Sequence, residues 1–204
     1  MIKKIEKISF PVILLVAMAL TAMGFAAKGC AEYHADLSAR KNGSLVTKQL
    51  TVADFTTDGM REKDGQWQTT DGDSQMIYST DGMFTGITFT ADYLVYPGDI
   101  ILYYTTQPGA DYSAKNRLYV SQDTDNPHLF SCSMPATYVA DIRLDPTTLA
   151  GNLIDFDTIT LNPPLTSADY LAVTPYTVLM FGIYSLLLAA VLRFVQEFFT
   201  KKFE

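Results

Sequence analysis

The sequence contains few of the residues that build catalytic or metal centres. Its 204 residues include only two cysteines and two histidines. Two cysteines cannot form a disulfide-dense scaffold or a cysteine-rich zinc site, and two histidines leave little for a histidine-based active site. Charged residues are also scarce, at 18% against about 25% in soluble proteins. This scarcity, with 48% hydrophobic residues, excludes a disordered chain and indicates membrane segments.

A basic surface and the common enzyme motifs are missing as well. The net charge of -7 argues against nucleic acid as a partner. The sequence has no nucleophile elbow, phosphate-binding loop, dinucleotide fingerprint or His-Glu-x-x-His motif. Pairs of carboxylates are abundant, but an acidic domain produces such pairs by chance. We therefore expect no enzyme, and a glycan hydrolase that uses two carboxylates or a metal is left as a third hypothesis.

Two long uncharged runs determine the predicted topology. Residues 8–27 and 170–192 carry no charge, and each run is long enough to cross a hydrocarbon core of ~30 Å. By the positive-inside rule, both termini (1–7 and 193–204) are cytoplasmic and residues 28–169 lie outside a bacterial cell membrane. The basic residues that give this orientation all flank the runs on the side away from the middle of the chain: Lys3, Lys4, Lys7, Arg193, Lys201 and Lys202.

The distribution of charge agrees with this orientation. Residues 28–169 have a net charge of -10, whereas the rest of the chain has +3. The first run also fits a cleavable signal peptide, but it exceeds the usual core of about 7–15 residues, so we favour an uncleaved anchor. Beyond Arg193, an apolar stripe beside lysines predicts that 193–204 lies along the inner surface of the membrane.

The middle of the chain reads as a β domain. Short apolar or alternating runs are separated by turn sequences such as Asp64-Gly65, Asp81-Gly82 and Pro97-Gly98, in which glycine accepts a positive φ without steric cost. The spacing of these runs is near that of an all-β sandwich or barrel. The predicted strands are 45–50, 52–56, 66–70, 76–79, 84–90, 99–106, 116–120, 128–133, 138–145 and 153–161.

Three of these strands carry more detailed predictions. Apolar and polar residues alternate through 138–145, so Arg143 and Asp145 share the polar face. The alternation slips within 153–161, which predicts a bulge near Asp157. Strand 99–106 is apolar on both faces and should be central. Together the strands suffice for a two-sheet sandwich of jelly-roll type, flanked by one transmembrane helix at each end.

Several landmarks in this region resemble a known module. They are Asp71-Gly-Asp73-Ser-Gln-Met-Ile77, Gly86-Ile-Thr-Phe89, Ile100-Ile-Leu-Tyr-Tyr104, Ile142-Arg-Leu-Asp-Pro146 and Asp155-Phe-Asp-Thr-Ile-Thr-Leu161. Over roughly 66–162 the chain resembles the carbohydrate-binding-like β-sandwich module found beside bacterial cell-envelope glycosyltransferases and polysaccharide-assembly membrane proteins. The resemblance implies a jelly roll and a role in surface glycans. Unlike the usual context of this module, we expect no catalytic domain within these 204 residues.

Two functions from different classes follow. The first is a non-catalytic, membrane-anchored accessory protein that binds cell-envelope glycan or supports its assembly, with a membrane glycosyltransferase or polysaccharide-assembly protein as partner. The alternative is a structural subunit whose β domain and transmembrane helices bind protein, with no affinity for sugar.

Sugar binding needs aromatic rings that stack on a pyranose and planar polar groups that bond its hydroxyls. Tyr93 and Tyr96 flank the turn at Pro97-Gly98, and Tyr112 lies in a loop rich in Gly and Asp. We expect these three rings to be stacking platforms, because binding residues concentrate on loops. Arg143 and Asp145 are the polar candidates, with a structural ion pair as their alternative role.

No cofactor is required by the sequence, and only a structural calcium ion is left open. Asp71, Asp73 and Asp81 could donate oxygens to it, although Asp-Gly turns explain these residues without a metal. A disulfide between Cys30 and Cys132 is also left open, since an oxidising exterior permits one.

Overall fold

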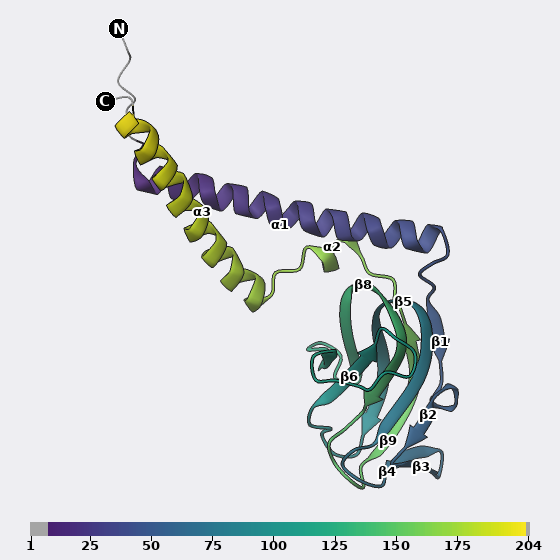
Figure 1. Cartoon of the computed structure of the whole chain (residues 1–204). Helices are drawn as coiled ribbons and strands as arrows, with labels where there is room; N and C mark the ends of the chain where they lie inside the picture. The colour runs from purple at the N-terminus through teal and green to yellow at the C-terminus, as the bar shows by residue number, and fades with distance from the viewer. Residues whose placement is uncertain (1–7, 203–204) are drawn as a thin grey trace. The chain divides into compact units, whose positions relative to one another are not determined.

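The computed structural model describes residues 8–202, which divide into two compact units (Figure 1). The helical unit comprises the chain up to His34 and from Leu165 onward, and the β domain comprises Ala35–Pro164. Three lysines on which the predicted orientation partly depends, Lys3, Lys4 and Lys7, lie outside the described residues.

Two long helices dominate the helical unit. Helix α1 spans Phe10–Lys41, the single turn α2 spans Ser167–Tyr170, and α3 spans Pro175–Lys202. Both α1 and α3 are long and apolar enough to cross a membrane, by length and composition. Helix α3 begins as expected of a helix with Pro at its first position, and the Thr174 hydroxyl accepts a hydrogen bond from the Thr177 N–H at 3.1 Å.

The two helices pack where their side chains are small. Ala17 of α1 and Ala189 of α3 are fully buried, next to the buried Ile13. Leu14, Leu188 and Leu192 pack around this contact. Small residues let two helical backbones approach closely, so the alanines set the position of the contact.

Helix α1 continues well beyond the apolar run 8–27, and this corrects the expectation that the β domain begins at residue 28. Residues 28–41 are polar but helical, supported by ion pairs at i,i+4 spacing, Lys28–Glu32 and Asp36–Arg40. The helix ends at Lys41, and Gly43, two residues later, has a φ of +78°, the left-handed conformation that commonly follows a helix. The lipid boundaries at residues 27, 170 and 192 stay predictions.

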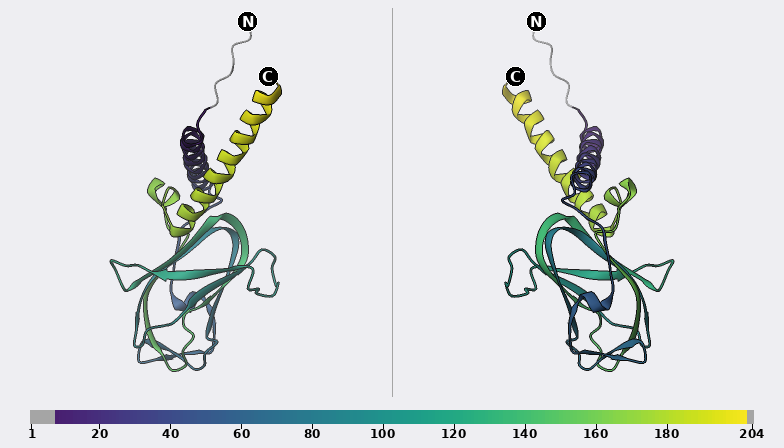
Figure 2. Two further views of the ribbon diagram at one scale, coloured as in Figure 1. Left: turned by 90° about the vertical axis from the view of Figure 1, so that its left-hand side faces the viewer. Right: turned by 90° about the vertical axis from the view of Figure 1, so that its right-hand side faces the viewer.

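The β domain is built from antiparallel strands, which confirms the predicted β-rich class. Its strands are β1 (Lys48–Leu50), β2 (Thr56–Asp58), β3 (Met60–Lys63), β4 (Gln66–Thr69), β5 (Gln75–Tyr93), β6 (Ile100–Thr105), β7 (Arg117–Gln122), β8 (Leu129–Asp145) and β9 (Leu153–Leu161). They hydrogen-bond in the order β3-β4-β9-β5-β8-β6-β7, with β1 on β9 and β2 on β5. This single sheet curves around one core (Figure 2). The jelly-roll sandwich stays a prediction.

Two pairs of predicted strands are in fact single long strands. Segments 76–79 and 84–90 both belong to β5, and 128–133 and 138–145 both belong to β8. The predicted turn at Asp81-Gly82 is a bulge, because the β5–β8 register shifts between Ser79 and Gly82. A second shift follows at Gly86, where a Cβ would collide with the carbonyl of Cys132. These irregularities bend β5 without ending it.

Elsewhere the sequence predictions agree with the structure. The β5–β9 register shifts opposite Asp157, between the partners Phe156 and Ile159, which confirms the bulge. Strand β6 pairs on both sides, with β7 and β8, so it is not an edge strand, but it lies next to the end of the sheet rather than at its centre. Asp64 and Gly65 both have positive φ in the β3–β4 hairpin. In contrast, 52–56 is mostly a short 3₁₀ helix, Val52–Asp54, because the Thr51 and Asp54 side chains and backbone bond each other there.

A polar cluster closes the domain where the chain enters and leaves it. Arg40 donates to Asp36 at 2.9 Å, to the Thr47 hydroxyl at 2.9 Å and to the carbonyls of Asn162 and Pro163 at 3.1 and 2.9 Å. The buried Asn162 side chain accepts from the Thr85 N–H and donates to two more carbonyls. These bonds join the end of α1 to the end of β9.

Candidate functional site

The polar face of β8 lies in the middle of the sheet. Ile142 and Leu144 are fully buried in the core, so Asp141, Arg143 and Asp145 lie on the opposite, outer face. Antiparallel register places Tyr103 of β6 directly beside Arg143. Partners that are directly opposite in a sheet share a face, which brings an aromatic ring next to the guanidinium.

Arg143 is fixed by two carboxylates. Its Nε and Nη2 donate to the two oxygens of Asp145 at 2.7 and 2.8 Å, and Nη2 also donates to Asp73 at 2.6 Å. The fork to Asp145 is the bidentate geometry that an arginine forms best. The Arg143 side chain is 18% exposed, and among the described residues Nη1 has no partner. Its remaining donors are therefore held in place and available.

Charge and burial oppose each other in this pair. The hydrogen bond to Asp145 raises the pKa of Arg143, because it favours the charged guanidinium. Burial nevertheless raises the pKa of Asp145 above the ordinary carboxyl value, and the attraction of Arg143 only partly offsets this. For the pKa of Asp145, the effect of burial is therefore larger than the effect of pairing with Arg143.

Two tyrosine rings lie beside the same guanidinium. The Arg143 Cζ atom is 5.3 Å from the ring centre of Tyr103 and 6.0 Å from that of Tyr112, within the range of cation–π contacts. Tyr112 comes from the loop between β6 and β7, and its pKa is raised first by burial and then by the charge of Asp141. We call this group, Tyr103, Tyr112, Asp141, Arg143, Asp145 and Asp73, the Arg143 face.

The structure thus brings together three of the five predicted binding residues, Tyr112, Arg143 and Asp145. Tyr93 is placed in the core, which corrects the expectation of a solvent-facing platform. Its hydroxyl donates to the Pro146 carbonyl at 3.1 Å, its ring lies edge-on to Phe130, and burial raises its pKa strongly. It is the last residue of a strand rather than a loop residue, and its side chain points inward.

Tyr96 lies in a separate exposed loop. Leu94, Val95 and Tyr96 are all exposed, Tyr96 by 69%. The backbone beneath them is fixed, because the Asn152 side chain bonds both the N–H and the carbonyl of Val95, and Thr147 bonds the carbonyl of Pro97. The loop is therefore a rigid apolar projection.

The three aspartates considered for calcium have different partners. Asp71 accepts the Asp73 N–H at 3.0 Å in a local turn, Asp73 pairs with Arg143, and Asp81 accepts the Tyr138 hydroxyl at 2.6 Å. In the described part of the chain, no group of three or more His, Cys, Asp or Glu could hold a metal ion. Cys30 and Cys132 are free thiols.

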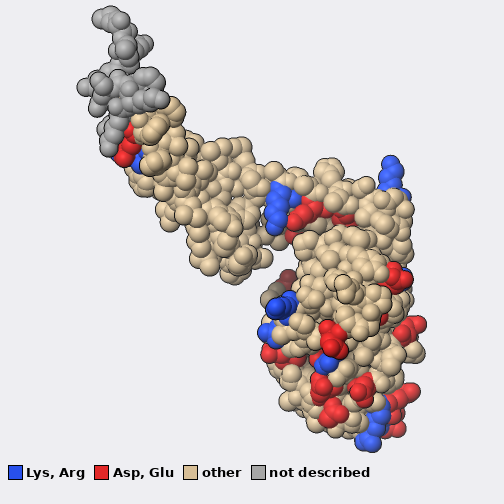
Figure 3. Space-filling model, in the orientation of Figure 1, with Lys and Arg blue, Asp and Glu red and all other residues tan. Residues whose placement is uncertain are grey.

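Tyr103, Asp141 and Asp73 were not among the predicted binding residues of the Arg143 face. Tyr103 stands on the outer side of β6, and alternation from the buried Leu102 could have indicated that. Its place beside Arg143 depends on a register between strands forty residues apart in the sequence, which no local pattern gives. Figure 3 shows charged side chains spread over the visible face of the β domain and on the polar part of α1, whereas the apolar stretches of the two long helices show almost none.

No family model matches the sequence, and no curated protein matches it. Solved structures give weak matches. A low-affinity xylan-binding module, CBM86, from Roseburia intestinalis is 16% identical with a TM-score of 0.36, over 57% of this chain and 94% of that one. The C-terminal CBM6 of LamC, a laminarinase from Zobellia galactanivorans, is 11% identical with a TM-score of 0.38, over 57% and 99%. The catalytic domain of Agl-KA is 11% identical, with a TM-score of 0.35, over 60% of this chain and 28% of that one. Matched structures thus include carbohydrate-binding modules; an association with glycosyltransferases stays a prediction.

Proposed function

We propose that the chain is a non-catalytic accessory protein, anchored in a bacterial membrane, whose β domain binds cell-envelope glycan on the Arg143 face. The observation that carries this proposal is the arrangement of Arg143, which is held by two carboxylates with two tyrosine rings beside it. A ring offers its face to the C–H side of a pyranose. The free Nη1 donors and the carboxylate oxygens complement sugar hydroxyls, which both donate and accept.

The glycan proposal is tested by binding of the full chain to a glycan array. A detergent without a sugar headgroup is needed, since a glycoside would compete. Tyr112→Ala should weaken retention by about tenfold, as expected for loss of ~1 kcal/mol of ring contact. Tyr138→Ala is the matched control, because Tyr138 is exposed but pairs with Asp81. Equal loss in both variants, or no retention of any glycan by the unaltered chain, would reject the proposal.

The proposed anchoring places both termini in the cytoplasm and the β domain outside. Its support is the pair of long apolar helices and the basic residues beyond both runs. With Cys30 and Cys132 both replaced by serine, an impermeant thiol reagent on intact cells should label a Ser44→Cys variant and not a Ser9→Cys or Thr200→Cys variant. External labelling at either terminus would contradict the topology. The mass of the purified chain shows whether residues 8–27 are retained.

A second candidate function rests on the exposed loop at Leu94, Val95 and Tyr96. Exposed apolar groups on a rigid backbone are typical of protein contacts, which favours a structural subunit that docks on a membrane glycosyltransferase or polysaccharide-assembly protein. Tyr96→Ala discriminates between the candidates. Loss of glycan retention would make Tyr96 part of the sugar site, whereas loss of a co-purifying membrane protein with glycan retention unchanged would favour docking.

A further inference from the structure

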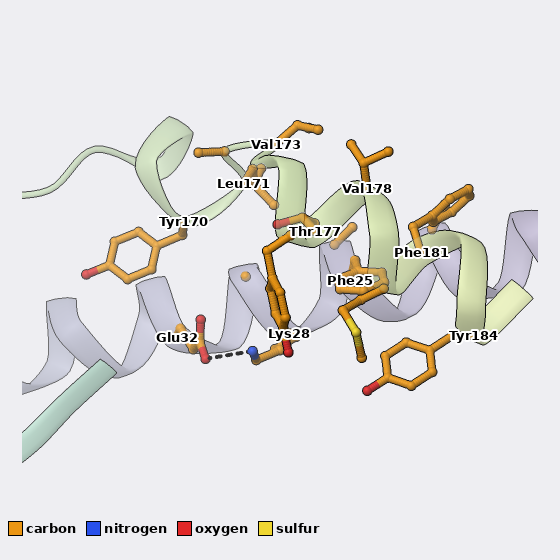
Figure 4. Close-up of a pocket in the computed structure, with 16 residues that line it drawn as sticks. Phe25, Lys28, Glu32, Tyr170, Leu171, Val173, Thr177, Val178, Phe181 and Tyr184 are labelled. Atoms are coloured by element: carbon orange, nitrogen blue, oxygen red, sulfur yellow. Dashed lines mark ion pairs between the residues drawn. The ribbon is translucent and has the colours of Figure 1, made fainter. Parts of the chain in front are cut away.

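A groove runs between α1 and α3 within the helical unit (Figure 4). The helices touch at Ala17 and Ala189, and the chain returns to α1 at Gly29. A Cβ on Gly29 would lie 2.6 Å from the Tyr170 carbonyl oxygen, so only glycine permits this second contact. The groove lies between the two contacts, with a volume of about 680 Å³. This is within the ~300–1,000 Å³ typical of small-molecule sites.

The lining of the groove is apolar and aromatic, with charge at one place. Phe25 of α1 lies 6.5 and 6.2 Å, ring centre to ring centre, from Phe181 and Tyr184 of α3. Among residues 8–202, Lys28 and Glu32 are the charged residues that line it. Both are labelled in Figure 4 next to the apolar side chains. A second cavity of about 350 Å³ is also lined by Phe25, Lys28 and Tyr184. Lys28 thus borders both spaces.

The position of Lys28 along the chain matters. It follows the uncharged run 8–27 directly, so in the proposed topology it stands at the level of the outer headgroups. A lysine at such a boundary extends its ammonium to the polar layer and leaves its methylenes in the apolar one. The groove below it then opens to the acyl chains.

The ion pair with Glu32 leaves this lysine available. The Lys28 ammonium is 3.7 Å from the Glu32 carboxylate, and the Lys28 side chain is 70% exposed. Such exposed pairs contribute little, and an ammonium has three donors. A phosphate can therefore bind Lys28 together with Glu32, or replace Glu32 as the partner of Lys28.

We propose that this groove binds one lipid with an anionic phosphate headgroup, the phosphate on Lys28 and an acyl chain against Phe25, Phe181 and Tyr184. The inference rests on the proposed membrane anchoring and is independent of glycan binding. A phospholipid is the occupant that combines an apolar chain with an anion at the depth of Lys28. The charge on Lys28 gives the preference for an anionic headgroup over a zwitterionic one.

The test is native mass spectrometry of the full chain released from nanodiscs of equal phosphatidylglycerol and phosphatidylcholine. One phosphatidylglycerol should be retained per chain, with about fivefold preference, as expected for one lysine at an anionic lipid. Lys28→Gln should abolish the preference, Lys28→Arg should keep it, and Glu32→Gln should increase it. Ala26→Trp fills the groove without changing its charge and should remove the bound lipid. Lys41→Gln, outside the groove on the same helix, is the control.

Each other outcome has one meaning. Equal retention of the two lipids would mean that the groove has no lipid preference and overturns the proposal. An equal loss of preference in Lys41→Gln and Lys28→Gln would mean general attraction of anionic lipid to the basic surface, which also overturns it. A dimer without bound lipid means that a second copy fills the groove and also overturns it. A chain that does not enter nanodiscs refutes the anchoring together with the lipid site, whereas insertion without a lipid preference refutes only the site.

Discussion

The two units treat their apolar side chains in opposite ways. In the β domain the large residues Met76, Phe84 and Ile87 are fully buried against one another. In the helical unit Leu15 and Val173 are 65% and 77% exposed. Burial of apolar surface is the main stabilising contribution to folding in water, so only the β domain has the core of a water-soluble fold. The exposed apolar side chains of the helical unit are compatible with the proposed membrane anchoring.

The polar groups of the two units also differ in where they find hydrogen-bond partners. Asn162 of the β domain bonds groups that are distant in the sequence. In the helical unit the hydroxyls of Thr21 and Thr200 bond carbonyls four residues back, at Ala17 and Gln196, both at 2.8 Å. A hydroxyl that satisfies itself on its own helix needs neither water nor a partner element. These two hydroxyls are thus satisfied within single helices, whereas Asn162 joins distant segments of the β domain.

The largest expected effect comes from truncating the β core. Phe84→Ala should lower the free energy of unfolding by about 3–5 kcal/mol, the cost of removing a buried aromatic ring. The single tryptophan, Trp67, packs against this core, so its fluorescence during urea unfolding of the full chain in micelles reports on the β domain alone. Leu187→Ala, an exposed position on α3, should leave that transition unchanged. A similar loss in both variants would contradict the division into two differently stabilised units.

Two ion pairs on α1 sharpen the comparison, because they have the same i,i+4 spacing in different units. The Asp36 side chain is 3% exposed beside Arg40, and Arg40 also bonds the carbonyls that end β9. Arg40→Ala leaves a buried carboxylate unpaired and should cost about 3 kcal/mol. Lys28→Ala removes only an exposed partner and should cost less than ~0.5 kcal/mol. The urea transition followed by Trp67 measures the cost of Arg40→Ala, and because Lys28 lies in the other unit, Lys28→Ala should leave this transition unchanged. An equal shift in both variants would mean that the Arg40 cluster does not hold the domain together.

Much of the β domain could be predicted, because its signals are local. The alternation in β8, the slip at Asp157 and the positive-φ turn at Asp64-Gly65 all depend on residues within a few positions of each other. Asp81-Gly82 was misread as a turn since a bulge uses the same residues. The helical extension to Lys41 was missed because its support is two charge pairs and a buried arginine contact to β9, rather than an apolar period.

The candidate site was only partly predictable, for a related reason. Alternation placed Arg143 and Asp145 on one face, and loop composition indicated Tyr112. The contact with Asp73 spans seventy residues, and the contact with Tyr103 depends on strand register. Tyr93 was misassigned because a residue at the end of a strand can point either into the core or into the loop. Contacts between distant strands are set by tertiary structure, which local patterns do not encode.

The smallest expected effect concerns the pH dependence at Asp145. Because burial raises its pKa in the folded state, the native chain holds this proton more tightly than the unfolded chain does. Stability contributed at this site is therefore present in acid and lost as pH rises through the raised pKa. Asp145→Asn removes this pH-dependent decrease in stability, and it also removes the bidentate hydrogen bonds with Arg143. The two effects oppose each other, so the net loss of unfolding free energy near neutral pH should be only ~0–1 kcal/mol. Relative to the unaltered chain, the variant should gain stability as pH rises from about 4 to 7. Urea unfolding followed by Trp67 fluorescence at each pH measures the difference. If the variant instead loses stability relative to the unaltered chain as pH rises, pairing with Arg143 outweighs burial in setting the pKa of Asp145. The Arg143 face would then be held together mainly by charge.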